Sequence, residues 1–269
     1  MSVNDRGIVA GFSDEQRRLA QSSLIRPVWP VAARVKAFST LRGPGGVSNH
    51  AFSSFNMGLR SGDEPAAVQM NRELLRLSVD LPSQPYWLNQ VHGLEVFEAK
   101  AAPQLGTEPV ADAAVCFTSN VVLAVLSADC LPILLCNREA TAIAAIHAGW
   151  RGLSAGVIEQ TIEKMRQPGK NLLAWLGPAA GPRAYEISTE VRDAFIQFDA
   201  AAEFCFSPIR PGHWLMDIYA LARQRLRKLG VQRVFGADYC SISQSEKFYS
   251  YRREGQTGRM ATMIYLSDS

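Results

Sequence analysis

Three side chains have the types and settings that metal chemistry needs. His92 lies in NQVHG at 89–93 and His147 in HAGWRG at 147–152, each where a predicted strand gives way to a glycine-containing turn. Cys130 lies at a break between two apolar runs, and loops at strand ends commonly carry functional groups. Two imidazoles and one thiolate suit zinc and leave the fourth tetrahedral position for water, which is the pattern of a catalytic site.

Spacing alone leaves other interpretations open. Cys130 can be a small buried hydrophobe beside two structural histidines, or half of a Cys–His nucleophilic pair without metal. A His₂Cys set can also hold a single copper ion when a methionine lies in a weak axial position. The chain has four histidines, too few for a multicopper oxidase centre. A purely structural zinc module is disfavoured because such sites close with four ligands.

Short apolar runs separated by polar breaks predict a buried sheet that positions these residues. The runs span 113–117, 121–127, 131–135 and 141–146, as is typical of strands buried on both faces. Apolar residues at helical spacing predict helices over 63–79, 157–165, 191–198 and 218–229. We therefore expect a mixed α/β fold with a central core of one or two packed sheets and helices outside.

Length and composition favour one catalytic domain. Of the 269 residues, 47% are hydrophobic and 20% charged, so a packed core can form. Residues 1–30 are polar and interrupted by Pro27 and Pro30. We expect an N-terminal extension over 1–30 and a single domain over 31–269.

Charge and cysteine content limit the kinds of binding partner and the cellular compartment that we expect. The formal charge of +3 lacks the strong basic excess of a nucleic-acid binder. No segment approaches the ~20 apolar residues that cross a bilayer, and residues 1–18 do not have the pattern of a signal peptide. The five cysteines include no CxxC pair, which argues against a disulfide scaffold. We expect a cytoplasmic protein that acts on a small molecule, with no nucleic-acid or membrane partner.

Eight motifs in a fixed order give the chain a family resemblance. From about residue 35 to residue 266 it resembles the polyphenol oxidase or laccase-domain family, also called the YfiH type or peptidoglycan editing factor family. The motifs are GGVS at 45–48, FNMG at 55–58, GDEP at 62–65, NQVHG at 89–93, ADCLP at 128–132, HAGWRG at 147–152, LGPA at 176–179 and FYSYRR at 248–253.

The resemblance implies a metal-dependent enzyme. It places the family's ligands on His92, Cys130 and His147, which would also be the catalytic residues, with Zn²⁺ as the cofactor and Cu²⁺ as the alternative. It implies phosphorolysis of adenosine, inosine and methylthioadenosine, together with deamination of adenosine. The family names imply two alternatives, which are copper-dependent polyphenol oxidation and amidase-type editing of a peptidoglycan precursor.

Phosphorolysis needs a cationic or amide-lined position for phosphate. Arg60, Arg42 and the glycine turn that ends at Ser48 are the candidates. Asp129 is the carboxylate next to Cys130, and we expect it either to move protons or to orient a metal ligand. Trp150 and Phe55 are candidates to stack on a purine base.

Overall fold

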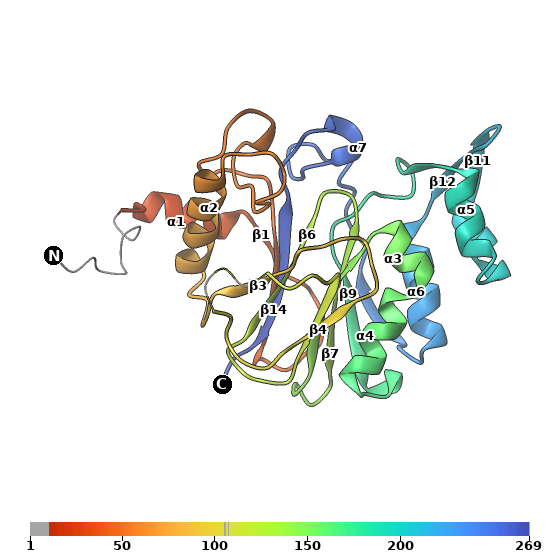
Figure 1. Cartoon of the computed structure of the whole chain (residues 1–269), viewed down its shortest axis with the longest axis horizontal. Helices are drawn as coiled ribbons and strands as arrows, with labels where there is room; N and C mark the ends of the chain where they lie inside the picture. Colours follow the sequence, from red (N-terminus) through yellow and green to blue (C-terminus); the bar gives the residue numbers. More distant parts are fainter. Residues whose placement is uncertain (1–10, 105, 107, 269) are drawn as a thin grey trace.

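Two β-sheets stack face to face at the centre of the computed structural model, which describes residues 11–104, 106 and 108–268 (Figure 1). The first has the strand order β1-β2-β14-β6-β3 and the second has the order β13-β9-β7-β8-β5-β4. The strands of the first are β1 (Leu24–Ile25), β2 (Val35–Thr40), β14 (Met260–Leu266), β6 (Val122–Ser127) and β3 (Pro85–Trp87). Those of the second are β13 (Arg233–Gly236), β9 (Leu172–Leu176), β7 (Leu131–Asn137), β8 (Ile143–Ala148), β5 (Ala113–Cys116) and β4 (Val96–Ala99).

The second sheet is apolar on both faces. Leu134 and Cys136 of β7 pack between the sheets, against residues such as Leu123 of β6. Ile133 and Leu135 of the same strand point the other way, into a separate core cluster. Because successive side chains alternate between faces, a strand covered on both sides must be a continuous apolar run. This confirms the strands predicted over 113–146.

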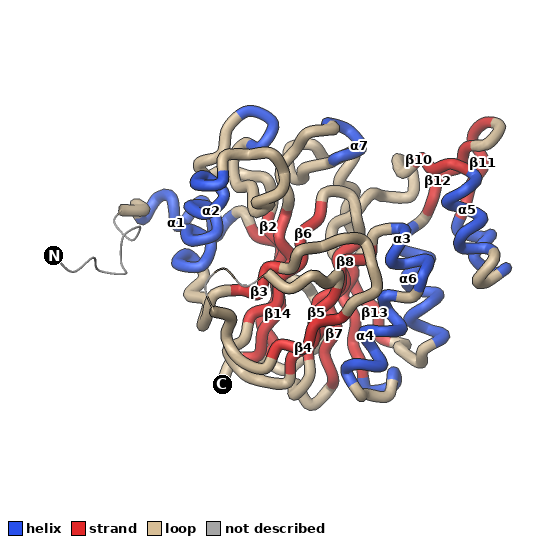
Figure 2. The backbone as a smooth tube through the Cα atoms, in the orientation of Figure 1, coloured by secondary structure: helices blue, strands red, loops and turns tan. Residues whose placement is uncertain are grey.

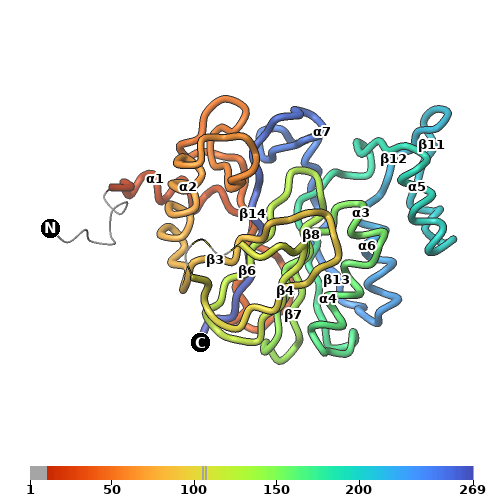
Figure 3. Tube along the Cα trace, viewed as in Figure 1, coloured from red at the N-terminus to blue at the C-terminus, as the bar shows by residue number. Residues whose placement is uncertain are grey.

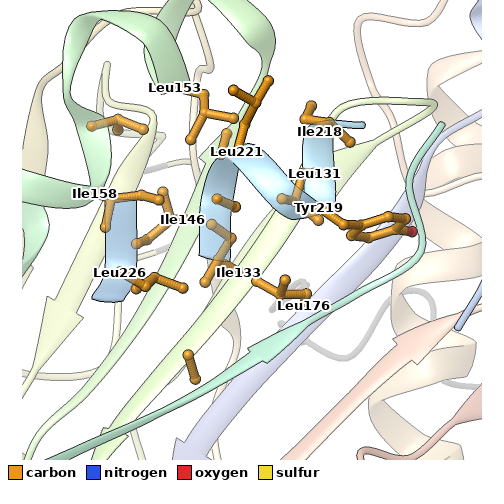
Figure 4. Packing of buried hydrophobic residues seen from close by; sticks show 14 of the residues in the cluster. Leu131, Ile133, Ile146, Leu153, Ile158, Leu176, Ile218, Tyr219, Leu221 and Leu226 are labelled. Carbon is orange, nitrogen blue, oxygen red and sulfur yellow. The ribbon is translucent and has the colours of Figure 1, made fainter. Parts of the chain in front are cut away.

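Helices cover the outer faces of both sheets (Figure 2). Leu153, Ile158 and Leu221 meet the second sheet at Ile133 and Ile146 (Figure 4). They belong to α3 (Trp150–Ala155), α4 (Val157–Met165) and α6 (Ile218–Lys228). On the other side α1 (Asp14–Ser22) and α2 (Pro65–Ser78) pack on the first sheet. The expected α/β architecture is confirmed, including the helices predicted at 63–79, 157–165 and 218–229.

A third, smaller sheet lies outside the two packed central sheets, and the sequence patterns did not predict it. It has the order β10-β12-β11, with β10 (Glu186–Ser188), β12 (His213–Met216) and β11 (Phe206–Arg210). Four of the five residues of β11 are exposed, so this strand lacks the apolar run that revealed the central strands. It lies beside α5 (Thr189–Ile196), which matches the helix predicted near 191–198, and η3 (Ala200–Cys205).

The first and last strands of the chain, β1 and β14, both belong to the first sheet, and Figure 3 shows α1 to one side of β14. Ser13 caps α1 through a capping box with Gln16, and β1 pairs with β2 through Leu24 and Thr40. The domain boundary at residue 30 stays a prediction. The remaining elements are short: η1 (His50–Phe52), η2 (Gly169–Asn171) and α7 (Tyr251–Glu254). Among the described helices, none has the length and apolarity to span a membrane.

Candidate metal centre

Two loops and the end of a strand bring His92, Cys130 and His147 together. His147 is the penultimate residue of β8, Cys130 lies in the turn between β6 and β7, and His92 follows β3. The antiparallel pairing of Leu131 with Ala148 sets the Cys130 turn beside the end of β8. Strand register thus positions two of the three side chains.

The three side chains form a compact trio. One ligand atom from each lies within 4.8 Å of the others. Cys130 Sγ is 3.8 Å from His92 Nε2, and the two imidazole rings meet edge to face with their centroids 4.8 Å apart. His92 is exposed, Cys130 is half-buried and His147 is buried. The predicted residues therefore converge, although 55 residues of sequence (92 to 147) separate the two histidines.

Gly149 gives the trio the room it needs. A Cβ atom at this position would lie 2.9 Å from His92 Cδ2 and 3.1 Å from Cys130 Sγ. Any larger residue would push these side chains aside. The donor set of two imidazoles and a thiolate is one that zinc prefers, and the absent side chain leaves both donors unobstructed. The residues present fit a zinc ion.

Asp112 anchors two of the three residues of the trio, and the sequence patterns did not single it out. Its Oδ1 lies 2.8 Å from His147 Nδ1. Its two oxygens also accept hydrogen bonds from the backbone N–H groups of Val91, His92 and Gly93 at 2.7–3.1 Å. Metal-binding histidines commonly use their second ring nitrogen in this way. The available signal was a lone carboxylate at the start of the apolar run over 113–117.

The trio has opposing charges when it holds no metal. Burial opposes ionisation of Cys130, but the neighbouring His147 and His92 outweigh it and lower the pKa of the thiol to about 6. Burial likewise disfavours charge on His147, but Cys130 and Asp112 raise its pKa to about 9. Burial also disfavours ionisation of Asp112, yet the hydrogen bonds from His147 and from backbone N–H groups lower its pKa. A thiolate beside an imidazolium is the state expected at neutral pH.

Asp129 supports the cysteine turn without touching either imidazole. Its Oδ1 accepts from Ser241 Oγ at 2.6 Å, and its Oδ2 accepts from Ser250 Oγ and from the Arg252 N–H. These bonds join the turn to the start of α7. Asp129 has a φ of 93°, and His92 has a φ of 60°, so two residues at the site adopt a conformation that costs free energy. Among the described hydrogen bonds, it is the Asp112 carboxylate and not that of Asp129 that contacts an imidazole of the trio.

The first of two adjoining cavities, the arginine-lined cavity, has a volume of about 340 Å³. The whole trio lines it together with Arg60, Arg72 and Arg259. Arg72 lies 3.9 Å from the centroid of the Trp87 ring, and burial lowers its pKa to about 10, so it stays protonated at neutral pH. Glu108 pairs with Arg60 at 2.6 Å and with Arg72 at 3.3 Å. Burial lowers the pKa of Arg259, although the nearby Cys130 and Asp129 favour its charged form.

The second cavity, the aromatic cavity, has a volume of about 510 Å³ and shares His92, Ala128, Cys130 and Tyr251 with the first. Its other walls are built from α3, β10 and β12 and include Trp150, Tyr185 and Glu186. Burial raises the pKa of the Tyr185 hydroxyl, which therefore stays protonated. His92 and Cys130 lie where the two cavities meet, and among the described lining residues His147 belongs to the arginine-lined cavity alone.

The phosphate candidates from the sequence separate into two groups. Arg60 lines the arginine-lined cavity, whereas Arg42 and Ser48 are not among its described lining residues. Arg42 donates to Glu254 at 2.7 Å, and Ser48 is 3% exposed and donates to Asp63 at 2.6 Å. These hydrogen bonds connect Arg42 to α7 and Ser48 to another loop residue, so we assign both residues to loop stability and not to phosphate binding.

Burial and position also distinguish the two aromatic residues that were candidates to stack on a purine base. Phe55 is fully buried and cannot reach a base, whereas Trp150 lines the aromatic cavity. Arg259, in the basic stretch that follows FYSYRR, stood out in the sequence as a residue that could close a pocket, and it does line the arginine-lined cavity. Sequence reasoning missed Arg72, which stands in no motif that singles it out from the other basic residues.

The fold and site define a class: a two-sheet α/β protein with a His₂Cys site open to two cavities. The chain belongs to the family described as multi-copper polyphenol oxidoreductase laccase, whose profile matches residues 36–267.

Two curated relatives carry a purine nucleoside name. The chain is 49% identical over 246 residues to "Purine nucleoside phosphorylase YfiH" of Escherichia coli strain K12, covering 91% of this chain and 99% of that protein. It is 47% identical over 245 residues to "Purine nucleoside phosphorylase PA4543" of Pseudomonas aeruginosa, covering 91% and 98%.

Solved structures share the fold. Protein NMB0706 of Neisseria meningitidis superposes with a TM-score of 0.86 at 44% identity, covering 91% of this chain and 99% of that one. YlmD from Geobacillus stearothermophilus superposes with a TM-score of 0.83 at 26% identity, covering 91% and 97%.

Proposed function

We propose that this chain is a zinc-dependent purine nucleoside enzyme that phosphorolyses adenosine, inosine and methylthioadenosine and deaminates adenosine. The observation that carries the proposal is the arginine-lined cavity, where His92, Cys130 and His147 adjoin three guanidinium groups. The relatives named purine nucleoside phosphorylase support the same substrate class.

The arginines account for the use of phosphate. Phosphorolysis transfers the sugar from the purine nitrogen to a phosphate oxygen through a transition state in which the sugar carries positive charge, so the phosphate must be held close to the anomeric carbon. Arg60, Arg72 and Arg259 provide planar donors suited to phosphate oxygens. Arg72 is held in place by its hydrogen bond to the Met57 carbonyl at 3.0 Å. Such preorganised donors stabilise developing charge without reorganisation.

Ser127 adds a polar group that lacks a partner within the described chain. Its hydroxyl is buried without a hydrogen-bond partner, and the residue lines the arginine-lined cavity. Buried hydroxyls are normally satisfied, so this one is free to bond a ligand. Gln90 differs, because its amide is engaged in both directions with the Leu126 backbone at 2.7–2.8 Å and holds the His92 loop against β6.

The trio accounts for metal dependence. His92, Cys130 and His147 would hold the zinc ion, and Asp112 would fix the His147 ring with its Nδ1 engaged. When bound, zinc supplies Lewis acidity beside the cavity. Zinc deaminases of nucleobases use related His and Cys ligands, which supports the deamination part of the proposal.

Single-copper oxidation finds less support. A blue-type site adds a weak axial methionine to two histidines and a cysteine. No methionine is among the described residues that line either cavity. Metal analysis of protein purified without added metal tests this choice: zinc supports the proposal, and copper with a blue absorption band contradicts it.

Incubation of adenosine with and without phosphate tests the reaction itself. With phosphate we expect ribose 1-phosphate and adenine, and in either condition we expect inosine from deamination. The same assay on Cys130→Ser provides the comparison with wild-type protein, because this change alters one proposed metal ligand with little change in size. Absence of every product, from protein shown to contain zinc, would contradict the proposal.

A further inference from the structure

The two cavities that meet at the trio differ in chemistry as well as in volume. They share His92, Ala128, Cys130 and Tyr251. Among its described lining residues, the arginine-lined cavity has three guanidinium groups, no carboxylate and, besides the imidazoles, one aromatic ring, that of Tyr251. The aromatic cavity has the rings of Trp150, Tyr185 and Tyr251, and its two guanidinium groups, of Arg151 and Arg252, are matched by the carboxylates of Asp129 and Glu186. A neutral purine nucleoside has no charge to match the guanidinium groups of the arginine-lined cavity, whereas phosphate does.

We propose that the aromatic cavity is the nucleoside subsite, with Trp150 and Tyr185 contacting the purine base and Glu186 recognising the 2′,3′-diol of the ribose. This inference rests on the proposed function and assigns its two substrates to separate spaces. The volume of about 510 Å³ lies within the usual range for small-molecule sites, roughly 300–1,000 Å³.

Both aromatic rings are held in place before a ligand arrives. Trp150 is the first residue of α3, and the Arg151 guanidinium lies 4.4 Å from the centroid of its indole ring. Tyr185 is 5% exposed, and the Arg252 guanidinium lies 5.4 Å from the centroid of its ring. Rings that do not reorganise lose little conformational freedom on binding, and aromatic faces stack on any base.

Glu186 offers an acceptor that is already oriented. Its Oε1 is engaged by His213 Nδ1 at 2.8 Å and by Arg210. Its Oε2 has no partner in the part of the chain that the structure describes. An ionised carboxylate accepts and does not donate, so a ligand that Glu186 recognises would present hydroxyl or amino donors to it.

The substrates themselves show which donors these are. Adenosine has an amino group at the purine 6-position and inosine has a carbonyl group there, so a carboxylate facing that position would reject inosine. Methylthioadenosine differs at the 5′ position. The 2′,3′-diol is common to all three, and a carboxylate facing the diol can accept all three.

Binding titrations in phosphate-free buffer test the assignment. The probes are inosine and 2′-deoxyinosine, because inosine is the product of deamination and is stable without phosphate. Wild-type protein is expected to bind inosine more tightly than 2′-deoxyinosine. Glu186→Gln should remove most of that preference. Trp150→Leu should lower the affinity for both probes by about fivefold or more, as the loss of a base–aromatic stack does.

Matched controls separate binding from stability. Glu190→Gln changes an exposed carboxylate on α5, and Trp29→Leu changes a half-buried indole packed between the sheets; both should leave the preference and the affinity unchanged. Trp150→Phe keeps a ring in place and should retain more affinity than Trp150→Leu, even if both variants are less stable.

The outcomes distinguish this inference from the proposed function. If Arg259→Gln weakens inosine binding while Glu186→Gln and Trp150→Leu do not, the subsite assignment is overturned and the enzyme activity is untouched. If inosine binds with the expected pattern but no nucleoside is turned over, the subsite stands and the proposed reaction fails. If the wild-type protein binds neither probe, both are overturned.

Discussion

The Nδ1 atom of His147 lies 2.8 Å from the Oδ1 atom of Asp112. The same carboxylate accepts the backbone N–H of His92 at 2.9 Å. One buried side chain thus fixes the ring of one metal-site histidine and the loop of the other. Such an anchor leaves the second ring nitrogen of His147 for the trio and reduces the reorganisation that metal binding requires.

Replacement of this anchor should weaken metal binding. Asp112→Asn keeps the shape but places an amide NH₂ among backbone N–H donors, so hydrogen bonds are lost in a buried position. We expect zinc affinity to fall by about 10- to 100-fold, measured by competition with a chromogenic chelator. Asp193→Asn, at a half-exposed carboxylate of α5, is the control. Equal zinc affinity in both variants would show that Asp112 does not support the site.

A methyl group at Gly149 should disturb the trio directly. The added Cβ of Gly149→Ala would lie 2.9 Å from His92 Cδ2 and 3.1 Å from Cys130 Sγ. We expect weaker zinc binding and at least tenfold lower turnover with a nearly unchanged melting temperature, on the order of the effect of losing an outer-shell partner. Gly93→Ala is the control, because its Cβ meets nothing closer than 3.5 Å. Full activity in Gly149→Ala would exclude a tight site here.

Metal binding should release a proton from the Cys130–His147 pair. Below a pH of about 6 both groups are protonated, and between a pH of about 6 and about 9 the pair holds one proton. Zinc needs both groups deprotonated. The number of protons released for each zinc ion bound should therefore fall by about one as pH rises from about 7.5 to about 10. Calorimetry in buffers of different ionisation enthalpy measures this number. A constant number would contradict the ion-paired state.

Phosphate affinity should depend on the cavity arginines and not on Arg42. Arg259→Gln removes a guanidinium that lines the cavity, so we expect the KM for phosphate to rise at least about tenfold, as the loss of a charge-assisted bond does. The KM for adenosine should change little. Arg42→Gln loses its ion pair with Glu254 and should lower stability without changing the KM for phosphate. An equal rise in the KM for phosphate in both variants would instead support a phosphate position at the glycine turn.

Much of the fold was predictable because its central strands are buried on both faces. Apolar runs such as 131–135 then stand out in the sequence, and β7 matches. The third sheet was not predictable in this way, since β11 and β12 have one buried residue each. The strand order could not be predicted from the sequence either, because β14 pairs with β2, which comes from the opposite end of the chain.

Residue types and positions were enough to predict that His92, Cys130 and His147 come together, but the surroundings of the trio were not predictable. Asp112 is 20 residues from His92 and 35 from His147, and its role depends on the β5–β8 pairing that sets it beside the imidazole. Asp129 was favoured because it adjoins Cys130, yet its carboxylate points to Ser241 and Ser250. Adjacency in sequence does not determine where a side chain points.

The most direct test of the central claim measures zinc content and nucleoside turnover on the same sample. Protein as purified, protein treated with chelator and protein reloaded with zinc are each assayed with adenosine and phosphate. We predict about one zinc per chain, loss of turnover with the metal and recovery on reloading. Turnover that persists after the metal is removed would contradict the account.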